Sequence, residues 1–286
     1  MIGFLKKFYY GIILTIAFIL SAGSALAEAN TDTAKKTTKI AILLYDGMTT
    51  LDAIGPYEVL QFIPNTKILF VAKRAGRVET DSKALSLVAP YGFSDVKEAD
   101  ILIIPGSANS TFIAMADPEI IDWVKRIDKT TQYTTSVCSG SLILAKAGIL
   151  EGKNATSHWA VTSVLSDFGA IPVTDQRVVT DGKVITAAGV SAGIDMALSL
   201  AARFSSEQDA KVSQLLIEYD PQPPFDSGSI QKASKETLDG AQKMLRTKSL
   251  TLKGVGAMIR LLGERVLEKT ICYLADFSGL TQRAFC

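Results

Sequence analysis

Short continuous runs of apolar residues alternate along this chain with stretches that have helical spacing. The runs at residues 39–45, 67–72 and 99–104 lack polar alternation, so each predicts a parallel strand buried on both faces. Residues 118–129 carry isoleucine and valine at helical spacing and predict an amphipathic helix. Strands that alternate with helices predict an α/β fold, a doubly wound, mostly parallel sheet with helices on both faces.

Other segments add shorter elements to this pattern. Turn residues and apolar runs set their limits. The expected elements are a loop and short helix at 50–60, a short strand at 85–90 beside the second strand, a hairpin with an Asp-Gly turn at 178–187, helices that begin at Thr156 and Gly193, and a proline-rich, non-helical arm at 219–226.

Cys138 stands where a strand pattern changes into a helix pattern. The β-branched stretch 132–137 precedes it, and small residues followed by leucine and alanine come after it. This order predicts a nucleophile elbow, in which a sharp turn exposes the side chain at the carboxyl end of a central strand. A thiol there faces the positive end of the following helix, which favours the thiolate by lowering the pKa. A buried, inert cysteine is the alternative, and the flanking strand and turn favour the elbow.

Other polar groups are expected to converge on this cysteine. Asp52 lies in a loop just beyond the first strand and is a candidate for proton exchange with the thiol or a water; a helix N-cap is its alternative role. The backbone N–H groups of Gly106, Ser107 and Ser139 are candidates for holding negative charge. Gly106 and Ser107 would otherwise form an ordinary turn. The Ser139 hydroxyl is a candidate partner of the thiol, a water or a substrate, or else a helix-start residue.

His158 is the only histidine and follows the elbow helix by a short connection. It is a candidate accessory general base, and a structural or surface role is the alternative. A single histidine excludes the usual zinc ligand sets, and no Cys/His cluster has metal-ligand spacing, so no metal site is expected.

The composition describes a globular protein with little net charge. Of the 286 residues, 48% are hydrophobic and 21% are charged, which allows a sizeable core. The 30 basic and 29 acidic residues give a net charge of +1, and this balance does not indicate a nucleic-acid partner.

Residues 1–27 have the pattern of a signal peptide. Lys6 and Lys7 precede an apolar stretch at 11–20, and Ala25-Leu26-Ala27 supplies small residues for cleavage after Ala27. An uncleaved anchoring helix is the alternative. With cleavage, the chain is exported to the periplasm or secreted, and it meets the membrane only through this segment beforehand.

The rest of the chain divides into three parts. A polar leader at 28–38 is expected to be flexible, residues 39–233 form the α/β domain, and 234–286 form a helical extension. The helical pattern from Ser234 to Leu267 is amphipathic and would cover a core face or a partner subunit, while residues 271–286 fit no pattern. Three cysteines leave at least one thiol free or paired between chains; Cys272 and Cys286 are able to pair, which leaves Cys138 free.

Several motifs carry a resemblance to a known family. They are Leu51-Asp52-Ala53-Ile54-Gly55-Pro56, Ile104-Pro105-Gly106, Thr135-Ser136-Val137-Cys138-Ser139-Gly140-Ser141-Leu142, the segments 148–159 and 193–198, and Glu218-Tyr219-Asp220-Pro221-Gln222-Pro223-Pro224-Phe225. With these motifs the chain resembles the ThiJ/PfpI superfamily, of class I glutamine amidotransferase-like fold, and within it the isocyanide hydratases. The resemblance covers about residues 38–262 and implies a flavodoxin-like sheet, a homodimer and no cofactor.

The resemblance also implies roles for two residues. Cys138 matches the family nucleophile, and Asp52 matches the acidic residue beside it. Superfamily peptidases have histidine directly after the nucleophile, where this chain has Ser139; the hydratases usually have threonine there and a second glycine at the position of Ser107. We therefore expect an enzyme that adds water to an isonitrile, or acts on another small electrophile, through a covalent Cys138 thioimidate. A non-catalytic or redox-responsive protein for stress or ligand binding is the alternative.

Overall fold

The computed structural model describes residues 36–249, 254, 256, 257, 259–261 and 263. The predicted signal peptide, nearly all of the predicted leader, and both Cys272 and Cys286 lie outside these residues. None of the helices in the described part of the chain is long and apolar enough to pass through a bilayer.

A seven-stranded sheet forms the centre of the fold, in the order β10-β11-β7-β6-β1-β2-β5. All neighbouring strands in it run parallel except β10 and β11, which pair antiparallel through the predicted Asp181-Gly182 turn. The strands are β1 (Thr38–Leu43), β2 (Thr66–Ala72), β5 (Tyr91–Gly92), β6 (Ile101–Ile104), β7 (Tyr133–Val137), β10 (Val178–Asp181) and β11 (Val184–Ala187).

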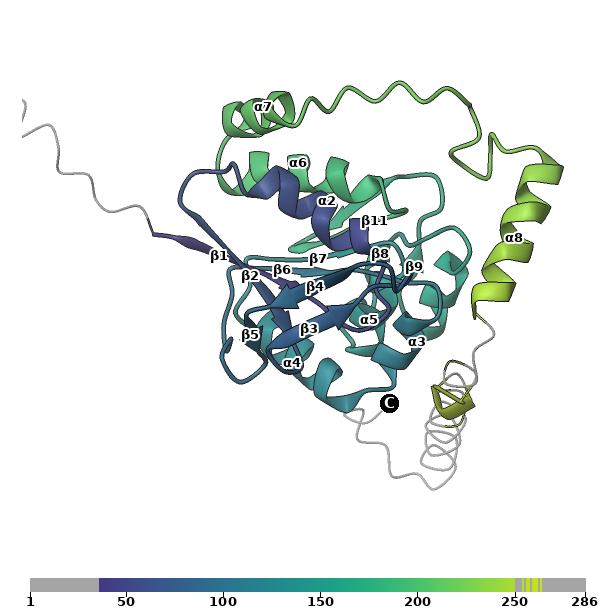
Figure 1. Ribbon diagram of the computed structural model, residues 1–286, viewed down its shortest axis with the longest axis horizontal. Helices are drawn as coiled ribbons and strands as arrows, with labels where there is room; N and C mark the ends of the chain where they lie inside the picture. Colours follow the sequence, from purple (N-terminus) through teal and green to yellow (C-terminus); the bar gives the residue numbers. More distant parts are fainter. Residues whose placement is uncertain (1–35, 250–253, 255, 258, 262, 264–286) are drawn as a thin grey trace, which may run out of the picture. The chain divides into compact units, whose positions relative to one another are not determined.

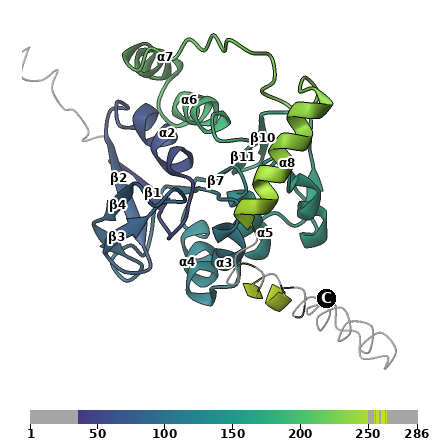
Figure 2. The same cartoon turned by 45° about the vertical axis from the view of Figure 1, so that its right-hand side comes forward.

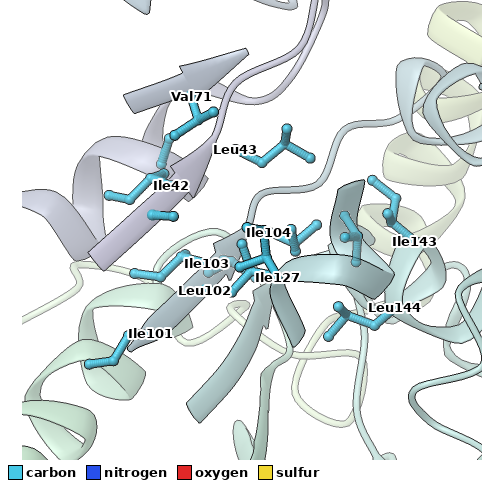
Figure 3. Packing of buried hydrophobic residues seen from close by; sticks show 14 of the residues in the cluster. Ile42, Leu43, Val71, Ile101, Leu102, Ile103, Ile104, Ile127, Ile143 and Leu144 are labelled. Carbon is cyan, nitrogen blue, oxygen red and sulfur yellow. The ribbon is translucent and has the colours of Figure 1, made fainter. Parts of the chain in front are cut away.

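The central strands are buried on both faces, as their continuous apolar runs predict. All residues of β6 are buried, and Ile103 pairs in register with Ile42 on one side and Thr135 on the other. Figure 3 shows isoleucine and leucine side chains of β1 and β6 packed together with those of the neighbouring helices. This packing fixes the register of the three strands whose ends carry the site.

Helices cover the sheet in two layers (Figures 1 and 2). Helices α2, α6 and α7 pack on one another over one face, and α3, α4 and α5 do so over the other. This arrangement confirms the doubly wound α/β fold. The helices are α2 (Thr50–Leu60), α3 (Ser110–Met115), α4 (Pro118–Asp128), α5 (Gly140–Lys146), α6 (Ala192–Phe204) and α7 (Glu207–Leu216), and α8 (Lys235–Ser249) lies in the extension predicted to be helical.

The chain reverses its direction of winding between β1 and β6. From β1 it proceeds outward to β2 and β5 on one side, then returns to place β6 and β7 on the other. Open α/β sheets bind ligands at the carboxyl ends of the strands where such a reversal occurs. The loops that follow β1, β6 and β7 therefore form the expected place for a site.

Two local predictions are wrong. Asp52 lies in the first turn of α2 rather than in a loop, because the helix begins at Thr50. The short strand predicted beside the second strand is present as β4 (Ser86–Ala89), which contacts β2 and forms an antiparallel hairpin with β3 (Gly76–Glu79).

The second error concerns the segment after α5. A helix was predicted from Thr156, but residues 156–158 are irregular and the helix there is a 3₁₀ helix at Thr162–Phe168. The Thr162 hydroxyl donates to the carbonyl oxygens of Ser157 and His158, at 3.1 and 2.9 Å. These bonds satisfy the carbonyls without an upstream helical turn. Two short strands flank this segment in sequence, β8 (Asn154–Ala155) before it and β9 (Ile171–Pro172) after it, and they pair with each other in parallel.

Candidate active site

Cys138 occupies the sharp turn between β7 and α5, as the elbow prediction requires. Its φ angle is 58°, a left-handed conformation that costs about 1–2 kcal/mol for a residue with a side chain. Its backbone N–H donates to the carbonyl oxygen of Ala187 at 3.0 Å. Strained backbone of this kind persists only where surrounding structure holds it, and it is concentrated at functional sites.

Two glycines allow the elbow to lie against the loop that follows β6. A Cβ atom on Gly140 would stand 2.2 Å from the carbonyl oxygen of Ile104, and one on Gly106 would stand 2.5 Å from the amide nitrogen of Ser139. Neither distance is possible for a real side chain. The close backbone approach explains why the small residues predicted to form the turn are needed on both segments.

Asp52 enters the site from α2 and is completely buried. Its Oδ2 accepts a 2.9 Å hydrogen bond from the Gly106 amide, while its Oδ1 is buried without a hydrogen-bond partner among the described residues. Burial raises the pKa of Asp52 to about 7, although the Gly106 amide and the Cys138 thiol each lower it in part. This carboxyl group can therefore take up or release a proton near neutral pH.

The expected thiolate at Cys138 is not the resting form of this site. Burial, followed by the negative charge of Asp52, raises the pKa of the Cys138 thiol well above its usual value, and the amide and hydroxyl of Ser139 offset only part of this. The side chain is only 6% exposed, and α5 is a helix of seven residues. Desolvation thus outweighs the favourable end of a short helix. The thiol is protonated until a base beside it accepts the proton.

The amides expected to stabilise negative charge already have partners. The Gly106 amide is bound to Asp52, and the Ser107 amide donates to the Ser139 hydroxyl oxygen at 2.9 Å. The Ser139 hydroxyl in turn donates to the Ser107 carbonyl oxygen at 2.6 Å. In this conformation the amides of Gly106 and Ser107 are therefore engaged within the site, and their role in holding negative charge stays a prediction. Of the three amides, the Ser139 amide is the one that hydrogen-bonds to the Cys138 thiol.

Two hydroxyl groups that the sequence did not single out extend this network. The Thr111 hydroxyl lies 2.8 Å from that of Ser139 and 3.2 Å from that of Tyr45, and all three residues are buried. The Tyr45 hydroxyl also donates to the Pro105 carbonyl oxygen at 3.0 Å. The network joins the ends of β1 and β6 to the elbow. No local pattern marks Tyr45 or Thr111, because their roles arise only from contacts between distant segments.

His158 is placed near the elbow, but its imidazole is engaged locally. The ring Nδ1 accepts a hydrogen bond from the Ala160 amide at 3.3 Å, and the ring lies 5.3 Å from that of Trp159. Burial lowers the pKa of His158, so the ring is neutral at pH 7. Its neighbour Ser157 makes the contact with the nucleophile, since the Ser157 hydroxyl donates to the Cys138 carbonyl oxygen at 3.1 Å.

The described residues hold no group of three or more His, Cys, Asp or Glu side chains able to bind a metal ion. What the structure brings together is a nearly buried thiol and a carboxyl group whose pKa lies near neutrality. This pair can generate a sulfur nucleophile by transfer of the thiol proton to the carboxylate, and can then return the proton to the adduct. Because the sulfur is nearly buried, an electrophile must bring its reactive atom to a recessed position.

Comparison with known proteins gives a consistent result. The sequence model that describes the DJ-1/PfpI family matches residues 38–203 of this chain. An isonitrile hydratase of Pseudomonas putida is 42% identical over 205 residues, which cover 72% of this chain and 89% of that protein. The crystal structure of a ThiJ/PfpI family protein from Pseudomonas syringae is 36% identical and superposes with a TM-score of 0.72 over 80% of this chain and 95% of that one.

A more distant structure shares the fold alone. Drosophila melanogaster DJ-1beta is 18% identical, with a TM-score of 0.58 over 64% of this chain and 98% of that one. The match confirms the architecture of the sheet and its helices.

Proposed function

The chain belongs to the DJ-1/PfpI family, and from this membership and the geometry at Cys138 we propose that it is an isonitrile hydratase, which converts an isonitrile and water into an N-substituted formamide. The observation that carries the proposal is the pairing of Cys138, in a strained elbow, with a buried Asp52 whose pKa is about 7. The likeness to the hydratase of Pseudomonas putida supports a family enzyme of hydratase type.

The first half of the reaction joins the substrate to the protein. Asp52, as the carboxylate, accepts the thiol proton while the Cys138 sulfur attacks the terminal carbon of R–N≡C. The new S–C bond leaves a carbanion at that carbon, and Asp52 returns the proton to it. The product is the thioimidate R–N=CH–S–Cys138, which contains all atoms of the thiol and the isonitrile.

The second half releases the product. Water adds to the thioimidate carbon, with Asp52 accepting a water proton and passing it to the nitrogen. The adduct R–NH–CH(OH)–S–Cys138 then collapses: the C–S bond breaks, the hydroxyl proton returns to sulfur through Asp52, and R–NH–CHO leaves. The sum is one isonitrile and one water consumed for one formamide formed, with no oxidant and no cofactor needed.

The burial of the site supports an isonitrile over bulkier electrophiles. The Cys138 side chain is almost buried and Asp52 is wholly so, which places the sulfur in a recessed position. An isonitrile presents its reactive carbon at the tip of a linear group, so that carbon can reach a recessed thiol while the substituent stays outside.

The redox-responsive alternative receives less support. A thiol that senses oxidants reacts as its thiolate, which an exposed position and a lowered pKa favour. Cys138 is buried and its pKa is raised. A redox thiol also has no need for a carboxyl group that exchanges protons at neutral pH, whereas hydration requires one.

The test is formamide production from a simple alkyl isonitrile by purified protein, followed by chromatography and mass spectrometry. We expect turnover by the wild type and none by Cys138→Ala. Absence of turnover by the wild type, while Cys138 remains open to alkylation, would remove the support for an isonitrile as substrate.

We also propose that the chain is exported and forms a homodimer. Export rests on the N-terminal sequence pattern; dimerisation rests on the family resemblance and on the exposed apolar side chains Val212, Leu215 and Leu216 of α7. The N-terminal peptide of protein recovered from the producing cell should begin at Glu28, and light scattering should give twice the chain mass. An intact N-terminus would contradict export, and a monomeric mass would contradict dimerisation.

A further inference from the structure

The carbonyl group of Cys138 has an unusual position because the backbone at this residue is left-handed. With φ at 58°, the chain leaves β7 at a sharp angle. Two hydroxyl groups satisfy the redirected carbonyl oxygen: that of Ser157 at 3.1 Å and that of Ser141 at a longer 3.4 Å. A buried carbonyl without a donor is unfavourable, so these contacts help to hold the strained turn.

Ser157 is rigidly held where it meets the elbow. Its side chain is buried, and its own carbonyl oxygen accepts from the Thr162 hydroxyl. The amide of Thr156 before it donates to the Thr186 hydroxyl at 2.8 Å, and Thr186 lies on β11, the strand that pairs with β7. The Ser157 hydroxyl is thus anchored to the same sheet whose adjacent strand ends in the nucleophile.

We propose that Ser157 is a positioning residue for the nucleophile: its hydroxyl, bound to the Cys138 carbonyl oxygen, fixes the turn that directs the thiol toward Asp52. The inference rests on the proposed function for its kinetic consequence, but its geometric consequence concerns the thiol alone. Without the hydroxyl the turn relaxes, and the sulfur moves away from the carboxyl group that must exchange its proton.

This assignment gives a role to the segment around the only histidine. The imidazole of His158 is bound to the Ala160 amide and lies beside Trp159, whereas the preceding serine reaches the backbone of Cys138. Ser157, rather than the ionisable residue next to it, connects this segment to the reaction.

The test compares Ser157→Ala with Ser157→Thr, which keeps the hydroxyl, in the full chain. A matched control is Ser166→Ala, which removes an exposed hydroxyl of the following 3₁₀ helix that donates, within the described part of the chain, to the Ser163 carbonyl oxygen. Hydration of a simple alkyl isonitrile gives kcat and KM. The rate of Cys138 alkylation by iodoacetamide, measured in short exposures from pH 7 to 12 because the pKa of this thiol is raised, gives the pH midpoint of the thiol without any need for turnover.

For Ser157→Ala we expect kcat to fall about tenfold with KM within about twofold, because a positioning contact acts on the chemical step. Burial and, after it, the negative charge of Asp52 raise the pKa of the thiol. The alkylation midpoint of Ser157→Ala should therefore fall by about half a pH unit or more as the sulfur leaves that carboxylate. Ser157→Thr and Ser166→Ala should match the wild type in both measurements.

If Ser157→Ala has the alkylation midpoint and the kcat of the wild type, the proposal is overturned. A lower melting temperature of this variant would not rescue it, since a merely structural bond changes only stability. If Ser157→Ala does not fold, the isosteric pair Ser157→Thr and Ser157→Val decides, because the two differ only in the hydroxyl. If the wild type hydrates no isonitrile, the proposed function fails, while the alkylation midpoints still decide the role of Ser157.

Discussion

The amide of Gly106 donates a 2.9 Å hydrogen bond to one carboxyl oxygen of Asp52, and the other oxygen is buried without a hydrogen-bond partner among the described residues. The arrangement orients the carboxyl group but does not fully satisfy it. A fully hydrogen-bonded carboxylate would have a low pKa and would hold its charge. Here burial prevails and the pKa rises to about 7, which suits a group that must both accept and donate a proton.

Replacement of Asp52 by asparagine should nearly abolish hydration. The asparagine oxygen can still accept from the Gly106 amide, so the fold is retained, but proton exchange is lost. We expect kcat to fall by about 10²–10⁴-fold, the range typical of a general acid–base group. Asp122→Asn is the control, since this carboxylate is exposed on α4 and is not among the groups that shift the pKa of Asp52. Near-normal turnover by Asp52→Asn would rule out the proton relay.

The rate of hydration should rise with pH through about 7. Asp52 must be a carboxylate to accept the thiol proton, and its pKa is about 7. Because the pKa of Cys138 is raised, the thiol still supplies that proton well above neutrality. Initial rates measured between pH 5.5 and 8.5 should follow this single ionisation. A rate that is flat across this range would show that Asp52 does not act as the base.

Stability should have the opposite pH dependence. Asp52 has a folded pKa of about 7 and a reference value of 3.8, so the folded state binds the additional proton between these values. Its stabilising contribution is fully present below pH 3.8 and is lost as pH rises through about 7. The free energy of unfolding should therefore fall with rising pH, by at most about 1.4 kcal/mol per unit from this group.

Urea denaturation between pH 4.5 and 7.5 measures this effect. The comparison with Asp52→Asn isolates it, since that variant cannot titrate at this position. Equal slopes in the two proteins would contradict the raised pKa.

An alanine at Gly140 should disrupt the elbow. Its Cβ would meet the Ile104 carbonyl oxygen at 2.2 Å, a backbone atom that cannot rotate away. We expect a loss of about 3 kcal/mol in the free energy of unfolding, with loss of hydration, because overpacking forces the backbone to shift. Gly189→Ala is the matched control, since a Cβ there meets no atom within 4 Å. Similar thermal stability of the two variants would contradict the close approach.

Replacement of His158 by glutamine should change hydration by less than about threefold, since the Nδ1 lone pair that would accept a proton is already bound to the Ala160 amide. The measurement is kcat/KM at pH 7.5. A loss comparable to that of Asp52→Asn would give His158 the accessory catalytic role that the sequence left open.

The strands and the elbow were predictable because their signals are local. Continuous apolar runs marked the buried strands, and Cys138 lay between a β-branched stretch and small residues. The thiol pKa was not predictable, because it depends on burial by segments far away in sequence. Two hydrogen bonds of the site were not predictable for the same reason. The Gly106 amide donates to Asp52, 54 residues earlier in the chain, and the Ser157 hydroxyl donates to the Cys138 carbonyl oxygen, 19 residues earlier.

The covalent step is tested most directly by the mass of the protein during turnover. Wild-type protein is mixed with an alkyl isonitrile, quenched in acid after short times and digested. Mass spectrometry then gives the mass of the peptide that contains Cys138. We predict an increase equal to the mass of one isonitrile on that peptide, with neither the adduct nor formamide formed by Cys138→Ala. Formamide production by Cys138→Ala at the wild-type rate, with no adduct in the wild type, would contradict the account.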